Sequence, residues 1–271
     1  MTTSDFYSIH DWFIFREIAD RMDDRLRLLK TPPKTIIIMG TDGAQSVQKL
    51  VARYPKTKIL EIDPEQSRLD ASKTIAKTQQ SFWQKLRQPY PQQRQQTFLQ
   101  EVPEKPFDML WSNLSLQKTK DLPSLFSHWA SLLRPEGMLF ASSLGSETLI
   151  QIRTLLSAHN IILTPEPFID MHDMGDLLAQ HGFSDPIVDM DKISLSYEQN
   201  KTFWQDMHLL GIWHLLGIQI EDQPLAKKVI NDAIEQHTLS TITLEVIYAH
   251  AVKNNAQDGV SIVHFHPKKH H

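Results

Sequence analysis

The chain has 271 residues, of which 41% are hydrophobic, and a formal net charge of −4 at pH 7. It contains no cysteine, which excludes disulfides, thiolate metal sites and cysteine nucleophiles. The negative net charge disfavours a nucleic-acid substrate, because there is no basic surplus to hold phosphates. We see neither a signal peptide nor an apolar run long enough to span a bilayer, so we expect no membrane partner and a cytoplasmic protein.

Apolar spacing predicts alternating helices and strands along most of the chain. In the N-terminal half the order helix, strand, helix, strand, helix is typical of a parallel α/β sheet with right-handed crossovers. The expected strands are 35–39, 58–63, 107–112, 138–142, 187–190, 193–197 and 241–252. The expected helices are 11–29, one from Val47, one ending near Lys77, then 121–133, 147–157, 201–217 and 224–237.

Two segments are unusual in composition. Residues 79–100 hold nine glutamines, which predicts a solvated helix and loop. The His- and Lys-rich tail, 266–271, is expected to be disordered, with a weak adventitious metal site as the alternative.

One acidic cluster resembles a metal site, with His172 beside Asp170, Asp173 and Asp176. We favour a helix start instead. Asp170 is a plausible N-cap and Asp173 a first-turn acid for a helix that buries Leu177. We therefore expect no resident metal.

A possible nucleoside site follows the first two predicted strands. Gly40 and Gly43 form a turn after the first strand, and Asp63 ends the second strand, 23 residues after Gly40. A carboxylate at that place accepts hydrogen bonds from both ribose hydroxyls, and the spacing is close to that of dinucleotide-binding folds. Ordinary turn and capping residues would give the same pattern, so this pair alone is weak evidence.

Longer motifs are more specific. They are Arg16-Glu17 through Arg25-Leu26, 107–117, 132–139, 142–145, 147–149 with Arg153, 168–176, 182–186 and 245–251. In these motifs the chain resembles the malonyl-acyl-carrier-protein O-methyltransferases of biotin synthesis, class I S-adenosylmethionine (SAM)-dependent methyltransferases, and their mitochondrial complex I assembly-factor relatives. The resemblance covers most of 11–252 and is weakest in 64–105.

The resemblance implies a doubly wound seven-stranded α/β sheet whose last strand is antiparallel. We expect one methyltransferase-fold domain over 1–271. Its expected parts are an N-terminal helix (11–33), a cofactor-binding half (34–145), an acceptor-side half (146–252) with a helical lid (198–237), and a tail (253–271).

The resemblance also implies the ligands. SAM is the expected methyl donor, with Asp63 on its ribose, and Gly40, Asp42, Gly43, Ser112 and Asn113 are the other expected cofactor-binding residues. The expected acceptor is the free carboxylate of a malonyl thioester on acyl carrier protein.

That reaction needs alignment more than acid–base help, because a carboxylate is already a nucleophile at pH 7. An arginine would orient it. Arg153 is our first candidate for this catalytic role and Arg16 our second, although either could equally be a solvated or ion-paired surface residue.

The donor loop departs from the family pattern of an acid followed by three alternating glycines. Ile38 stands in place of the acid, Asp42 in place of the second glycine and Ala44 in place of the third; only Gly40 is in register, and Gly43 lies one residue off. Two hypotheses follow. Either Asp42 replaces the missing acid and the donor still binds, or the chain keeps the fold without the donor, as a degenerate assembly factor or binding partner.

Two helical segments remain open. The aromatic and methionine-rich stretch 203–214 is either a simply packed helix or a lid over the acyl-thioester pocket. The arginines of the first helix are either a solvated face or a basic patch for an acidic carrier protein. They are Arg16, Arg21, Arg25 and Arg27.

Overall fold

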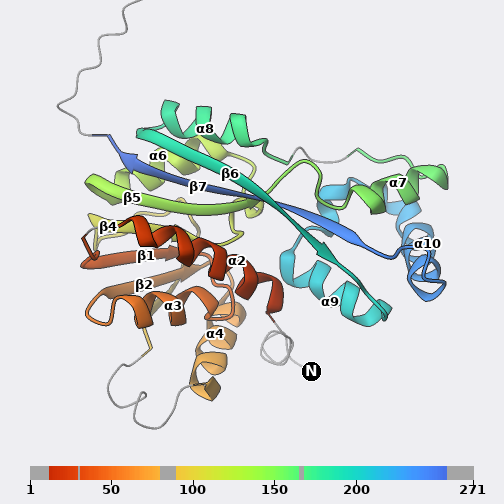
Figure 1. The fold of residues 1–271 in the computed structure, drawn as a ribbon, viewed down its shortest axis with the longest axis horizontal. Helices are drawn as coiled ribbons and strands as arrows, with labels where there is room; N and C mark the ends of the chain where they lie inside the picture. The colour runs from red at the N-terminus through yellow and green to blue at the C-terminus, as the bar shows by residue number, and fades with distance from the viewer. Residues whose placement is uncertain (1–11, 30, 80–89, 165–167, 255–271) are drawn as a thin grey trace, which may run out of the picture.

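The computed structural model describes residues 12–29, 31–79, 90–164 and 168–254. A seven-stranded sheet runs through the molecule in the order β3-β2-β1-β4-β5-β7-β6 (Figure 1). β7 is antiparallel to both of its neighbours and the other pairs are parallel. The strands are β1 (Thr35–Met39), β2 (Lys58–Asp63), β3 (Gln92–Gln95), β4 (Phe107–Ser112), β5 (Leu133–Leu144), β6 (Phe183–Leu195) and β7 (Ile242–Lys253).

Helices connect and cover these strands, as the alternating pattern predicted. The α-helices are α2 (Phe13–Arg25), α3 (Gln45–Arg53), α4 (Gln66–Gln79), α6 (Leu122–Leu132), α7 (Ile150–Ala158), α8 (Met171–Gln180), α9 (Asn200–Leu210) and α10 (Gln223–Glu235). Short 3-10 helices are η1 (Leu26–Leu28), η2 (Leu116–Lys118), η3 (Trp213–Leu216) and η4 (Ile220–Asp222). None of the helices in the described part of the chain is long and apolar enough to cross a membrane.

β1 shows why the sheet is buried on both faces. Ile36 and Ile38 join the apolar cluster that includes residues of α2 and α3, whereas Ile37 and Met39 join the cluster with residues of α6 and α8. Successive side chains of a strand point to opposite faces, so an unbroken apolar run fits a strand with helices on each side. This is the doubly wound α/β architecture expected from the sequence.

Three sequence expectations need correction. The two strands expected in 187–197 are the single strand β6, which pairs with β7 along its length apart from a bulge after Ser184. The glutamine-rich segment contributes β3, which pairs with β2 at the sheet edge, because backbone pairing there needs no apolar side chains. The helix expected over 201–217 ends at Leu210, because Gly211 takes a left-handed backbone (φ +67°). Residues 80–89 and the tail 266–271 lie outside the described part of the chain.

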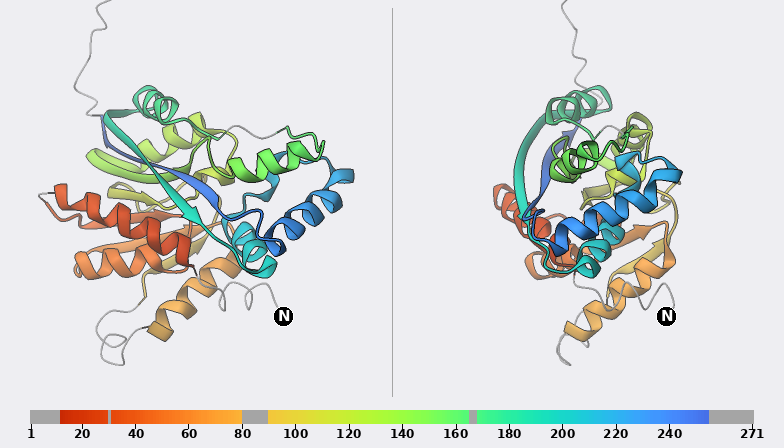
Figure 2. Two further views of the ribbon diagram at one scale, coloured as in Figure 1. Left: turned by 45° about the vertical axis from the view of Figure 1, so that its right-hand side comes forward. Right: turned by 90° about the vertical axis from the view of Figure 1, so that its right-hand side faces the viewer.

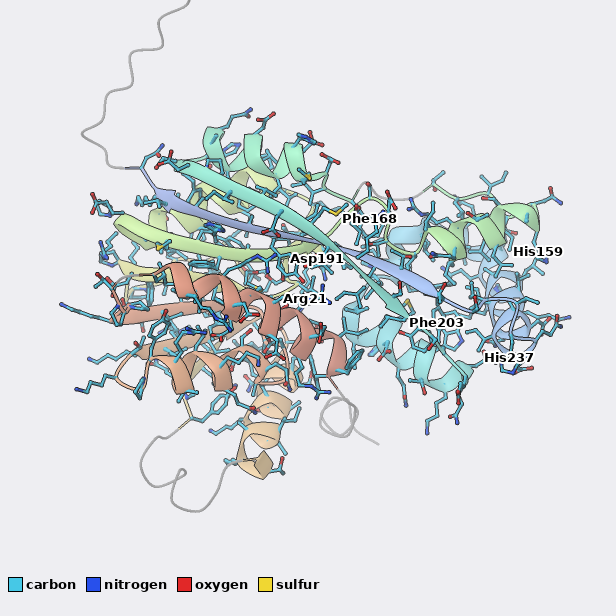
Figure 3. All side chains as sticks on the ribbon, in the orientation of Figure 1. Arg21, His159, Phe168, Asp191, Phe203 and His237 are labelled. Carbon is cyan, nitrogen blue, oxygen red and sulfur yellow. The ribbon has the colours of Figure 1, made fainter. Side chains whose placement is uncertain are left out.

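α2 is tied to the opposite edge of the sheet by its arginines (Figure 3). A nitrogen of Arg21 lies 3.1 Å from a carboxylate oxygen of Asp191 on β6, and one of Arg25 lies 2.5 Å from Asp189. The Arg25 guanidinium also stacks over the Tyr248 ring of β7, 3.9 Å from its centroid. These contacts hold α2 across the sheet and so position its N-terminal end.

A group of helices lies at one end of the sheet, where the long β6–β7 pair ends (Figure 2). It contains α7, α9 and α10. Tyr197, Phe203, Trp204 and Trp213 form a chain of aromatic contacts through it, with ring centroids 4.8–5.4 Å apart. Phe203 is fully buried, and the aromatic stretch is divided between α9, which ends at Leu210, and η3, which begins at Trp213. Its role as a lid stays a prediction.

Candidate functional site

The turn after β1 brings the first two strand ends together. The Gly40 amide donates to the carbonyl of Ile62 (2.8 Å), and Gly40 has φ +88°. A Cβ at Gly40 would lie 2.6 Å from Cβ of Ser115. Glycine is therefore required here, both for the backbone conformation and for the close approach of the segment that follows β4.

Asp63 ends β2 beside this turn and is fully buried. One of its oxygens accepts the Thr41 amide (3.0 Å) and the Lys118 ammonium (3.2 Å), and the other accepts the Glu65 amide (2.9 Å). The position is the one the sequence predicted for a ribose-binding carboxylate. A carboxylate at this strand end can accept hydrogen bonds from ribose hydroxyls. A hydroxyl would have to compete with Lys118 for the carboxylate oxygen that Lys118 contacts.

Asp42 lies inside a hydrogen-bonded network. Its carboxylate accepts the amide of Ser46 (3.1 Å), the Ser46 hydroxyl (2.5 Å) and the Asn113 side-chain amide (2.7 Å). The Trp111 indole donates to the same hydroxyl (2.7 Å). Asp42 is 1% exposed, and this burial raises its pKa. Its charge supports the first turn of α3 and faces the chain's own donors.

The structure brings the two predicted residues after β4 into this neighbourhood. Asn113 donates to the carbonyl of Phe15 (3.0 Å) and accepts the Ser142 hydroxyl (3.2 Å), while Ser112 shares a hydrogen bond with Ser115. Ser112 and Asn113 are both buried. The six predicted cofactor-binding residues thus cluster at adjoining strand ends, and their direct contact with a donor stays a prediction.

A cavity of about 410 Å³ opens next to this cluster, at the carboxyl ends of β4 and β5. Its wall is mostly apolar, with Phe168 and Leu215 arriving from beyond the sheet. The full lining is Leu116, Gln117, Thr119, Lys120, Leu122, Ser143, Leu144, Phe168, Ile169 and Leu215. A mainly apolar cavity with a few polar groups at strand ends is the usual setting of a small-molecule site in a doubly wound sheet.

Gln117 is the notable polar residue of that wall. Its amide nitrogen and oxygen are buried, and neither has a hydrogen-bond partner among the described residues. Leaving a buried amide unsatisfied costs about 1–3 kcal/mol. A polar ligand in the cavity would supply the missing partner. Gln117 is also next in sequence to Lys118, so η2 links the cavity to Asp63.

The two arginines predicted to orient an acceptor lie outside the cavity wall. Arg153 is half-buried on α7, and its guanidinium donates to the carbonyl of Ser146 (2.5 Å). Arg16 is exposed on α2, with its guanidinium carbon 5.9 Å from the centre of the Phe13 ring. Neither arginine lines the cavity, and their role at the acceptor carboxylate stays a prediction.

The basic patch considered for α2 is offset by acids. Arg21 and Arg25 pair with β6 as described above, and Arg27 pairs with Asp24 (2.6 Å). Three of the four arginines are thus paired with acids, which favours an ion-paired helix face, and a basic patch for a carrier protein stays a prediction. Asp170 is the N-cap of α8, as predicted, because its carboxylate accepts the amide of His172 (2.8 Å). The described residues contain no group of three or more potential metal ligands.

Sequence reasoning missed four side chains at this site. They are Trp12, Arg68, Gln117 and Lys118. Gln117 belonged to a recognised motif, so its place after β4 could have identified it. No local pattern marks the other three, because their contacts depend on how α2, α4 and η2 meet in space.

The sheet order, the glycine turn after β1 and the carboxylate ending β2 define a class I methyltransferase fold. A methyltransferase domain family matches residues 39–141. The solved phosphoethanolamine N-methyltransferase 2 of Haemonchus contortus, in complex with S-adenosylhomocysteine, superposes with a TM-score of 0.55 at 14% identity, covering 94% of this chain and 61% of that chain.

Sequence relatives identify the particular family. Malonyl-[acyl-carrier protein] O-methyltransferase of Methylovorus sp. (strain MP688) is 30% identical over 93% of this chain and 88% of its own length. The enzyme of the same name from Gallionella capsiferriformans is 30% identical over 92% and 88%. The chain therefore belongs to the malonyl-[acyl-carrier protein] O-methyltransferase family.

Proposed function

We propose that this chain is a SAM-dependent methyltransferase that methylates the free carboxylate of malonyl-acyl carrier protein, a step of biotin synthesis. Family membership over nearly the whole chain is the observation that carries the proposal. The cavity beside the donor loop supports it, because an acyl thioester needs a mainly apolar site with few polar contacts.

The chain's residues have defined tasks under this proposal. When bound, SAM supplies an electrophilic methyl group on a sulfonium that is a good leaving group. Asp63 would hold the ribose, and the turn from Gly40 to Gly43 would face the methionine end. The cavity would exclude water from the malonyl carboxylate, which is nucleophilic without a general base. Arg153 and Arg16 remain proposed partners of that carboxylate.

Methyl transfer tests the proposal directly. Purified protein incubated with malonyl-acyl carrier protein and isotopically labelled SAM should yield a labelled methyl ester, measured by mass spectrometry of the carrier. Carrier protein without the malonyl group is the control. Failure to form the ester, together with failure to restore growth of a biotin-requiring strain that lacks its methyltransferase, would reject the proposal.

A second candidate function is a degenerate, non-catalytic binding protein. It is favoured by one specific feature, the altered donor loop with Ile38, Asp42 and Ala44 in place of an acid and two glycines. The same methyl-transfer assay separates the two functions, because a well-folded non-catalytic protein gives no ester at any donor concentration.

Gln117→Leu tests the acceptor cavity. The amide has no hydrogen-bond partner among the described residues, so the stability of the variant should equal or exceed that of the parent chain. The KM for the malonyl carrier should rise about tenfold, the loss of roughly one hydrogen bond. Chemical denaturation and steady-state kinetics measure the two effects.

Gln151→Leu is the matched control. Gln151 donates to the Thr243 hydroxyl (2.7 Å) and accepts the Thr243 amide (3.0 Å), so its loss should lower stability while leaving KM unchanged. An unchanged KM in Gln117→Leu would show that the amide does not contact the acceptor.

A further inference from the structure

The donor loop is covered by an aromatic ring of the chain itself. Gly43 has φ +69°, and a methyl group placed on it would lie 2.4 Å from Cδ2 of Trp12. The Trp12 ring therefore packs directly against the loop backbone. It is 2% exposed, and it stands immediately before α2 beside Phe15, with ring centroids 5.2 Å apart.

A buried cation from α4 lies beneath this ring. The Arg68 guanidinium carbon is 4.9 Å from the Trp12 ring centroid and 5.8 Å from that of Phe15. Its Nη2 donates to the carbonyl of Thr41 in the donor loop (3.2 Å), and its Nη1 donates to the carbonyl of Leu209 on α9 (3.1 Å). Only 3% of Arg68 is exposed, so this charge is enclosed by protein.

The same cation faces the ribose carboxylate. Nε of Arg68 lies 3.9 Å from Asp63, and the ammonium of Lys118 lies 3.2 Å from the same carboxylate oxygen. Two positive side chains thus surround the carboxylate that the donor requires. The donor also carries a positive charge, on its sulfonium, and like charges repel strongly in a buried site. Arg68 therefore disfavours binding of the donor while it stays at this place.

We propose that the donor site of this chain is held closed by its own residues, with the Arg68 guanidinium bound to the donor loop beside Asp63 and with Trp12 as the cover. SAM binds only after Trp12 and Arg68 leave the loop. The proposal rests on the proposed function, since it concerns the donor of that reaction. The apparent affinity for SAM is then the intrinsic affinity multiplied by the fraction of molecules in the open state.

The position of the cover suggests how the site opens. Trp12 stands directly before α2, which the Arg21–Asp191 and Arg25–Asp189 pairs hold against β6 (Figure 3). A swing about the start of α2 would therefore expose the loop without breaking these two ion pairs. Release of Arg68 would also require that its hydrogen bonds with the Thr41 and Leu209 carbonyls be exchanged for water.

Binding of SAM and of S-adenosylhomocysteine, measured by calorimetry, tests the closure without depending on turnover, because both need the cover removed and only SAM carries the sulfonium charge that Arg68 opposes. Arg68→Met keeps the bulk of the side chain and removes its charge, and Trp12→Ala removes the cover. Each variant should bind at least tenfold more tightly than the parent chain. Arg53→Met is the matched control, because Arg53 pairs with Asp23 away from the loop (2.5 Å), and its affinity should equal that of the parent.

A second measurement stands in case the variants unfold. Acrylamide quenching of the parent chain should increase when S-adenosylhomocysteine is added, because Trp12 becomes exposed, and Trp12→Phe should lack this increase. Equal affinities in all chains would overturn the closure and leave the proposed methyl transfer intact. Folded variants that show no binding at millimolar ligand would overturn both the closure and the donor on which the proposed function depends.

Discussion

As the pH rises from 5 to 8, the free energy of unfolding of the native chain should fall by about 3 kcal/mol because of Glu61. In the Glu61→Gln variant this fall should be absent. Glu61 lies in the middle of β2 and is fully buried. Its carboxyl accepts the hydroxyl of Tyr90 (2.9 Å), the side-chain amide of Gln93 (2.8 Å) and the hydroxyl of Ser72 (3.3 Å). Burial nevertheless dominates and raises the pKa of Glu61 from 4.5 to about 7.

The sign follows from proton binding. The unfolded chain loses this proton near pH 4.5, whereas the folded chain keeps it until about pH 7. The stabilisation is therefore complete below pH 4.5 and is lost as the pH rises through 7. At about 1.4 kcal/mol for each pH unit between pH 5 and pH 7, the loss over the tested range approaches 3 kcal/mol.

The difference between variant and parent isolates this group. His128 and His250 act in the opposite direction. Burial lowers their pKa values, so their contribution to the stability of the folded chain is lost as the pH falls. Urea unfolding of both chains at pH 5, 6, 7 and 8 should show the difference growing with pH. Glu101→Gln, an exposed glutamate paired with Lys105, is the control and should not change the pH dependence between 5 and 8. Parallel curves for Glu61→Gln and the parent would contradict the prediction.

The strands that could be predicted from the sequence are those that consist of short, mainly apolar runs. β1, β2 and β4 begin and end where the pattern indicates, because strands buried on both faces need mainly apolar residues, although Glu61 lies within β2 and Asp108 within β4. β3 has no such run, since Gln92–Gln95 form an edge strand held by backbone pairing to β2. Its glutamines still serve the core, because Gln93 donates to buried Glu61.

The candidate site divides in the same way. Gly40 and Asp63 could be placed from sequence because each ends a strand, and strand ends converge at one edge of the sheet. The contact of Trp12 with Gly43 and the enclosure of Arg68 could not, because they join α2, the donor loop and α4 through packing alone. Local sequence patterns predict the strand ends that form the site. The side chains that fill the site depend on tertiary contacts, which these patterns do not predict.

Asp42→Ala should destabilise the chain by about 3 kcal/mol or more. The carboxylate satisfies three donors, and its removal leaves the Ser46 amide, the Ser46 hydroxyl and the Asn113 amide buried without it. Asp70→Ala, which removes an exposed acceptor of Gln66, should cost little and is the control. Thermal and urea unfolding measure both changes, and a double variant with Ser46→Ala should lose less than the sum of the single changes.

The same residue tests the first hypothesis for the donor loop, in which Asp42 replaces the missing acid. If the carboxylate of Asp42 serves the ligand's ammonium, Asp42→Asn should weaken S-adenosylhomocysteine binding at nearly unchanged stability. The network predicts the reverse. The amide would present a donor to groups that are themselves donors, lowering stability by about 1–2 kcal/mol, while ligand affinity, measured where the variant is folded, would stay within about threefold of the parent. Since Asp42 is already satisfied by Ser46 and Asn113, we expect this second outcome, which assigns Asp42 to holding the loop in shape and leaves the loop's opening to Trp12 and Arg68.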